Sequence, residues 1–218
     1  MRTVNVDIGY EVGTRKYHYV GVGSSKEVYQ LVTDNDAIIK VPRALSDTYG
    51  LNGNTLNVFK PENLDQVDEV LGSISDQSEG MVWPVGQLLV EIFVWEKLLE
   101  LEKEGYDISC FARIKDYYFD NWGIPVIIQE KVEDRCPSGR EWEEFNNKFE
   151  IISDILEERW DIRLHDIREG NIGFIDDEPK LYDFGMINYI FDDYMDYDAY
   201  EEACFEEEDD YYDDEEDC

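Results

Sequence analysis

The chain has 218 residues, of which 43% are hydrophobic and 14% aromatic, so it can bury enough apolar surface to fold around a core. Its 53 acidic residues against 19 basic ones give a formal charge of -34, which disfavours direct binding to nucleic acid or to an anionic membrane surface. The longest apolar run, residues 88–95, is far shorter than the roughly 20 residues that span a bilayer. We therefore expect a globular chain whose partners include neither nucleic acid nor a membrane.

The cysteines and the first residues of the chain bear on its compartment. Cys110, Cys136, Cys204 and Cys218 form no CxxC pair and have no zinc-site spacing. The first twelve residues show no charged segment followed by an apolar one. These features predict a reduced, cytoplasmic protein.

Residues 17–41 predict three short strands. An alternating run is followed by a glycine-containing turn, a second run centred on residues 28–32, an Asp-Asn-Asp turn and the apolar segment AIIKV. Antiparallel strands can be joined by such short turns, so we expect a meander.

The middle of the chain predicts two helices and two further strands. A short helix is expected over 61–71, and an amphipathic helix over 85–104, where apolar residues recur every three or four positions and Gly105 follows as a stop. Strands are expected over 110–118 and 124–130. With the meander they complete a five-stranded antiparallel sheet.

The last third of the chain changes character twice. A helix is expected over 140–160, followed by short strands and turns around HDIREGNIGF and KLYDFG. No base follows Lys180, whereas residues 181–218 contain 17 acids. The segment 192–218 has no apolar period and a dense like charge, which predicts a disordered acidic tail.

Four motifs occur in one order along the chain: GVGSSKEV at 21–28, AIIK at 37–40, HDIREGN at 165–171 and DFG at 183–185. Their order and spacing resemble the signature set of the protein-kinase-like superfamily. The small size and the short segment after the last motif are similar to compact bacterial or bacteriophage members of that superfamily.

The resemblance implies an α+β fold with two lobes and an ATP-dependent phosphotransferase activity. The N-lobe would cover 1–131, with the five-stranded sheet and one helix that corresponds to the family's αC. A reduced, helical C-lobe would cover 132–191, with the tail at 192–218. The implied cofactors are ATP and Mg²⁺, and the implied acceptor is a hydroxyl of a protein Ser, Thr or Tyr, which includes the chain itself.

The resemblance also assigns the nucleotide contacts. Gly21 and Gly23 would let a strand turn close over the phosphates, since a Cβ there would obstruct the approach. Val28 would pack on the adenine, and the backbones of Glu130 and Val132 would bind its edge.

Lys40 would hold the α and β phosphates, oriented by a carboxylate of the helix expected at 85–104. Glu91 and Glu96 both flank the apolar side of this helix, and we favour Glu91. Lys26 replaces the third glycine of the family's loop, where a lysine could itself reach phosphate.

The remaining site residues come from the last two motifs. Asp166 would orient the acceptor hydroxyl, Arg168 would bind the γ-phosphate, and Asn171 and Asp183 would be the magnesium ligands, because this ion prefers hard oxygen donors.

Two departures from the family leave other functions open. Histidine replaces the usual arginine immediately before Asp166, and only 33 residues follow Gly185, too few for the helices that normally bind a peptide substrate. The first alternative is a pseudokinase or acidic decoy that binds a basic partner through its tail. The second is a phosphotransferase that acts on a small molecule.

Overall fold

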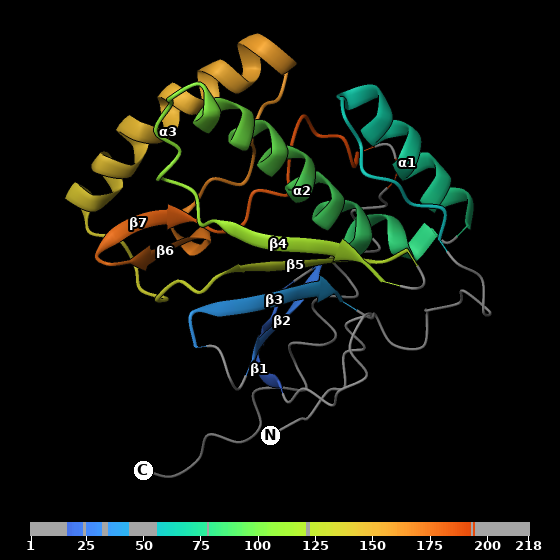
Figure 1. Cartoon of the computed structure of the whole chain (residues 1–218), viewed down its shortest axis with the longest axis horizontal. Coiled ribbons are helices and arrows are strands. Elements are labelled where there is room, and N and C mark those ends of the chain that lie inside the picture. The colour runs from blue at the N-terminus through green and yellow to red at the C-terminus, as the bar shows by residue number, and fades with distance from the viewer. Residues whose placement is uncertain are drawn as a thin grey trace.

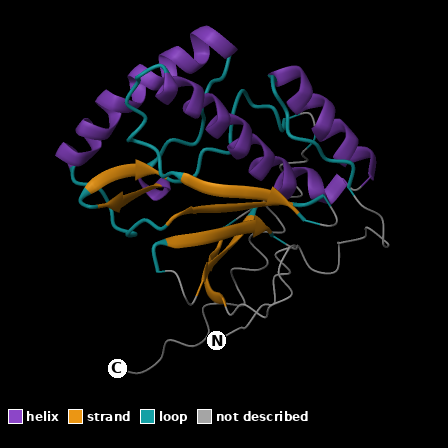
Figure 2. Cartoon of the chain, viewed as in Figure 1, coloured by secondary structure: helices purple, strands orange, loops and turns teal. Residues whose placement is uncertain are grey.

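The computed structural model describes residues 17–23, 25–31, 35–43, 56–77, 79–120, 123–192 and 194. Over these residues the protein is an α+β chain in which helices cover one face of an antiparallel sheet (Figures 1 and 2). The tail expected over 192–218 lies outside the described residues, apart from 192 and 194.

The main sheet has five strands in the order β1-β2-β3-β5-β4, and every neighbouring pair is antiparallel. This confirms the five-stranded antiparallel sheet. The strands are β1 (Tyr17–Val22), β2 (Lys26–Leu31), β3 (Ala37–Pro42), β4 (Ile114–Phe119) and β5 (Pro125–Glu130).

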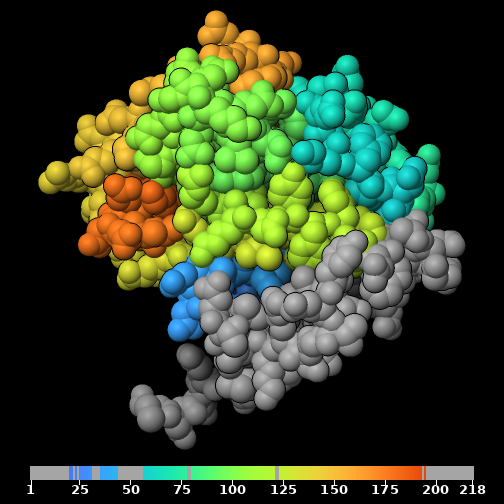
Figure 3. Space-filling model, in the orientation of Figure 1, coloured from blue at the N-terminus to red at the C-terminus, as the bar shows by residue number. Residues whose placement is uncertain are grey.

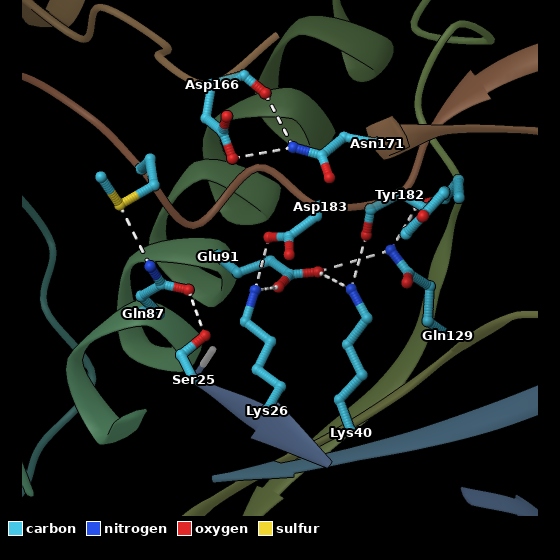
Figure 4. Close-up of polar contacts among 12 residues, drawn as sticks. Ser25, Lys26, Lys40, Gln87, Glu91, Gln129, Asp166, Asn171, Tyr182 and Asp183 are labelled. Carbon is cyan, nitrogen blue, oxygen red and sulfur yellow. Dashed lines mark hydrogen bonds and ion pairs between the residues drawn. The ribbon is translucent and has the colours of Figure 1, made fainter. Parts of the chain in front are cut away.

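The register of β2 and β3 decides which side chains share a face. Val28 lies directly opposite Lys40, so both point to the same side of the sheet. Lys26 is two residues from Val28 and points there as well. Tyr29 and Ile39 point the other way and form a small separate cluster with Val126. The face that carries the two lysines is the one covered by helix α2 (Figure 4).

Helix α2 (Val82–Lys103) follows a short 3-10 turn, η1 (Glu79–Met81), and ends before Gly105, whose φ of 97° suits a glycine. It begins three residues earlier than expected. The expected amphipathic character is wrong for its first half, because every residue from 84 to 95 is buried. Helix α1 and Phe191 pack against the first half of α2 at Gly86, and α3 meets the other end of α2, where Lys97 lies over the Trp160 ring.

Helix α1 (Leu64–Gln77) is longer than the expected 61–71, and its buried residues share one side: Val67, Val70, Leu71 and Ile74. It approaches α2 at Gly86, where an added Cβ would lie 2.6 Å from Leu71. In Figure 3 the two helices form one continuous face of the molecule.

Helix α3 (Gly139–Trp160) starts at a capping box, in which the Ser138 and Glu141 side chains bond reciprocally to each other's backbone N–H. After it come a second 3-10 turn, η2 (Glu169–Asn171), and a hairpin of β6 (Ile172–Ile175) and β7 (Glu178–Leu181).

The strand expected over 110–118 begins only at Ile114. Residues 110–112 pair instead with β7: Leu181 N–H donates to Cys110 O at 2.7 Å, and Ala112 N–H donates to Leu181 O at 2.9 Å. This short bridge joins the main sheet to the hairpin. No helix in the described part of the chain is long and apolar enough to cross a membrane.

Candidate functional site

A buried ion pair joins the sheet to α2. Lys40 Nζ lies 2.6 Å from Glu91 Oε1, and the side chains are 3% and 0% exposed. Glu96, the other carboxylate considered, lies near the surface and bonds to Lys60 and Tyr117. The structure therefore joins Lys40 to Glu91.

Lys26 is the second cation of this cluster. Its Nζ lies 2.9 Å from Glu91 Oε2 and 2.5 Å from Asp183 Oδ1. Figure 4 shows the two lysines rising side by side from the sheet, with Glu91 between their ammonium groups and Asp183 above Lys26. Two lysines and two acidic side chains thus lie in contact, and of the four only the Asp183 side chain is partly exposed, at 32%.

The two lysines differ in their titration. Burial lowers the pKa of Lys40, and the attraction of Glu91 does not offset it. Burial acts on Lys26 too, but Asp183 and Glu91 together raise the pKa of Lys26 above its usual value. Burial would raise the pKa of Asp183, yet Lys26 and then Lys40 hold it at about 2. Lys26 and Asp183 are therefore charged at neutral pH.

The β6–β7 hairpin brings Asn171 and Asp183 to the same end of the fold. Ile172, which follows Asn171, pairs with Leu181, two residues before Asp183. Tyr182 N–H then donates to Asn171 O at 3.0 Å. Two residues that are twelve apart in sequence therefore meet, as the motif spacing predicts.

Asp166 is fixed by Asn171. The Asn171 Nδ2 donates to the backbone O of Asp166 at 2.8 Å and to its Oδ2 at 2.9 Å. Asp166 has a φ of 59°, a left-handed conformation that costs free energy in a non-glycine residue. Arg168 Nε lies 3.0 Å from Asp166 Oδ1, and both side chains are exposed. In this structure Arg168 therefore pairs with Asp166.

The DFG segment packs directly on the cluster. Lys40 Nζ donates to Tyr182 O at 2.5 Å. Gly185 lies so close to α2 that an added Cβ would be 2.5 Å from Gln87 O. Phe184 is fully buried in the core.

Two residues that the sequence analysis did not single out hold the start of β2 on α2. The Ser25 hydroxyl donates to the Gln87 side chain, and the Gln87 Nε2 contacts Met186 Sδ. Gln87 precedes Glu91 by four residues, so both lie on one side of the helix. This spacing from Glu91 is the sequence signal that could have indicated Gln87 as a residue of the site.

The predicted phosphate loop leaves room for side chains at its two glycines within the described part of the chain. Among the described residues, a Cβ added to Gly21 would have no neighbour within 4 Å, and one added to Gly23 would meet only Lys26 O at 3.9 Å. The packing of these residues therefore does not require glycine at either position. Val28 lies opposite Lys40 on the same face of the sheet.

The predicted adenine contacts lie where β5 leaves the sheet. Glu130 N–H donates to Arg113 O at 2.9 Å, and the Glu130 carboxylate accepts from Arg113 N–H. Val132 packs against Gly173, where an added Cβ would clash with its side chain. The segment after β5 thus lies against the hairpin that carries Asn171.

Gln129 is fully buried beneath this segment, and its Nε2 lies 3.3 Å from Ala112 O. The backbone N–H of His165 donates to Met186 O at 2.9 Å, and the His165 ring packs against Tyr189.

The donor set fits a hard divalent cation. Asn171 turns its amide nitrogen to Asp166, which leaves its carbonyl oxygen on the side of Asp183 (Figure 4). No group of three or more His, Cys, Asp or Glu side chains in the described residues could hold a metal alone. Mg²⁺ needs no such cage, because it is usually bound by one or two protein oxygens together with phosphates and water.

No protein-family profile matches the sequence, and no curated protein is significantly similar to it.

Proposed function

We propose that the chain is a compact, kinase-like phosphotransferase that uses ATP and Mg²⁺, with a protein hydroxyl as the acceptor. The observation that carries this proposal is the buried Lys40–Glu91 pair, beside which the β6–β7 hairpin presents Asn171 and Asp183. A lysine held rigidly by a buried carboxylate offers a fixed positive charge to phosphate oxygens.

In the proposed reaction, Lys40 binds the α and β phosphates while Asn171 and Asp183 hold the metal. The metal, when bound, supplies charge that neutralises the transferring phosphoryl group. The bond from the γ-phosphorus to the bridging oxygen breaks, ADP keeps the electron pair, and the acceptor oxygen bonds to phosphorus. Asp166 orients the acceptor and takes its proton.

Transfer of label from γ-labelled ATP, to the chain itself or to proteins of a cell lysate, tests the proposal. We expect the Asp183→Asn variant to lose transfer by a factor on the order of 100 or more, since one charge-stabilising group contributes about that much. Its stabilisation by ATP with Mg²⁺ in thermal unfolding should disappear too.

Asp177→Asn is the matched control, because Asp177 lies in the turn of the same hairpin with a side chain that is 98% exposed. It should keep wild-type transfer. Equal labelling by the wild type and the Asp183→Asn variant would refute the site.

A further inference from the structure

One buried cation has no task in the reaction as described. Lys40 alone suffices as the lysine that binds the α and β phosphates, yet Lys26 shares its carboxylate partner and is buried as deeply. Desolvating a second ammonium group is costly unless it is paired. Its partners are Glu91 and Asp183, and Asp183 is the residue to which we assign the metal.

The backbone places this ammonium next to the predicted phosphate loop. Lys26 is the first residue of β2 and follows the turn that contains Gly23, while Gly21 lies near the end of β1. Ser25 anchors the turn to α2 through Gln87. The Lys26 Nζ lies 3.3 Å from the position of a Cβ at Gly185, so it is packed against the DFG backbone.

We propose that Lys26 is a second phosphate-binding lysine, which rests on Asp183 in the arrangement seen here and is displaced from it by the metal ion that accompanies the nucleotide. This inference rests on the proposed function.

The displacement follows from charge. Asp183 Oδ1 cannot hold an ammonium group at 2.5 Å and a divalent cation at the same time without strong repulsion between the cations. The lysine side chain has a flexible stem and three donors, so its head group can turn to a phosphate oxygen while β2 stays in place. With the metal on Asp183, Lys26 adds a positive charge that the triphosphate can use. Metal and nucleotide should therefore bind with positive coupling.

Amine labelling of the wild-type chain tests the release directly. The chain is treated with an acylating reagent alone, with Mn²⁺, and with Mn²⁺ plus a non-hydrolysable ATP analogue, and modification of Lys26 is quantified by mass spectrometry. We expect labelling of Lys26 to rise several-fold with Mn²⁺ alone and to fall again with the analogue. Lys131, exposed and bonded to Gln30, is the internal reference and should not change. Labelling of Lys26 that ignores Mn²⁺ would overturn the proposal.

A substitution gives an independent test in which two affinities move in opposite directions. Lys26→Met removes the competitor for Asp183, so Mn²⁺ alone, followed by its electron paramagnetic resonance signal, should bind about tenfold more tightly. The ATP analogue with Mn²⁺ should bind about tenfold less tightly, which is roughly one charge-assisted hydrogen bond. Lys60→Met is the control, because Lys60 is the exposed partner of Glu96, which lies on α2 as Glu91 does. This substitution should change neither the Mn²⁺ affinity nor the affinity for the ATP analogue.

A purely structural lysine would weaken both affinities, and this outcome counts against the proposal. If Lys26→Met fails to fold, the labelling experiment still decides on the wild-type chain. The Mn²⁺ arm needs no nucleotide: release of Lys26 by Mn²⁺ without any response to the ATP analogue would refute the proposed function alone. A response to the analogue with no release would refute this inference alone.

Discussion

Glu91 is the residue on which the cluster depends, because its two carboxylate oxygens accept from different lysines of neighbouring strands. The carboxylate is fully buried, and Gln129 lies at the limit of hydrogen-bond distance from the same Oε1. A buried charge is tolerated only when its partners are in place, so Glu91 must be considered together with Lys26 and Lys40.

Glu91→Gln should destabilise the fold by about 3 kcal/mol or more, because Lys40 then keeps an ammonium group in the interior with no carboxylate in contact. Urea denaturation measures the change in the free energy of unfolding. Glu96→Gln is the matched control on the same helix; its exposed pair with Lys60 contributes about 0–1 kcal/mol. Equal effects of the two substitutions would contradict the buried-pair interpretation.

The part of the site that sequence predicts is the part carried by motif spacing. The structure pairs Lys40 with Glu91 and Asp166 with Asn171, and it brings Asn171 and Asp183 to one end of the fold. The motifs indicated all of these residues except Glu91, which was favoured for its place on the expected helix. The contacts of Lys26 could not be predicted in the same way, because they depend on β2–β3 register and on where α2 crosses the sheet. Tertiary packing sets both. The two-residue spacing of Lys26 and Val28 predicts only that they lie on the same face of the sheet.

At the scale of elements, α2 holds the site together, since one of its sides receives β2, β3 and the DFG segment. The DFG segment lies against α2 at Gly185, where an added Cβ would be only 2.5 Å from Gln87 O. A side chain there must push the DFG segment away from the helix, because backbone cannot yield as a flexible side chain does.

Gly185→Ala should therefore cost about 1–3 kcal/mol of stability and weaken binding of the ATP analogue, because Asp183 moves with the segment. Thermal unfolding and a fluorescence titration measure the two effects. Gly139→Ala, at the exposed first turn of α3 where an added Cβ meets nothing within 4 Å, should leave both unchanged. Binding unaffected by Gly185→Ala would mean that this contact does not position Asp183.

The elements themselves were largely accessible from local pattern. Alternation of apolar residues predicted the strands, and turn residues predicted their connections. Local pattern failed where burial is decided by distant segments. The first half of α2 is buried on all sides because α1 and Phe191, from distant parts of the chain, pack against it at Gly86. Residues 110–112 leave the main sheet because Leu181, 70 positions later, supplies their hydrogen bonds.

For the molecule as a whole, charge is the dominant feature. Each of the 19 basic residues can neutralise the charge of at most one of the 53 acidic ones, so a net charge of -34 stays uncompensated whatever the details of pairing. Self-repulsion of this kind destabilises the compact state. Exposed ion pairs, such as Arg159–Glu104, act in the opposite direction but contribute little each.

Monovalent salt screens both the self-repulsion and the exposed ion pairs. The balance of the two decides whether salt raises or lowers the stability of the fold. Because the excess of negative charge is large and each exposed pair contributes little, NaCl between 0.01 and 0.2 M should stabilise the chain. If screening contributes about 1 kcal/mol, the Tm should rise by about 2–4 °C in a scanning calorimetry series. Chelator in every sample keeps divalent ions from acting at Asp183, and sucrose of matched osmolarity controls for a solute effect without charge. A Tm that falls with salt would show that the ion pairs outweigh the repulsion.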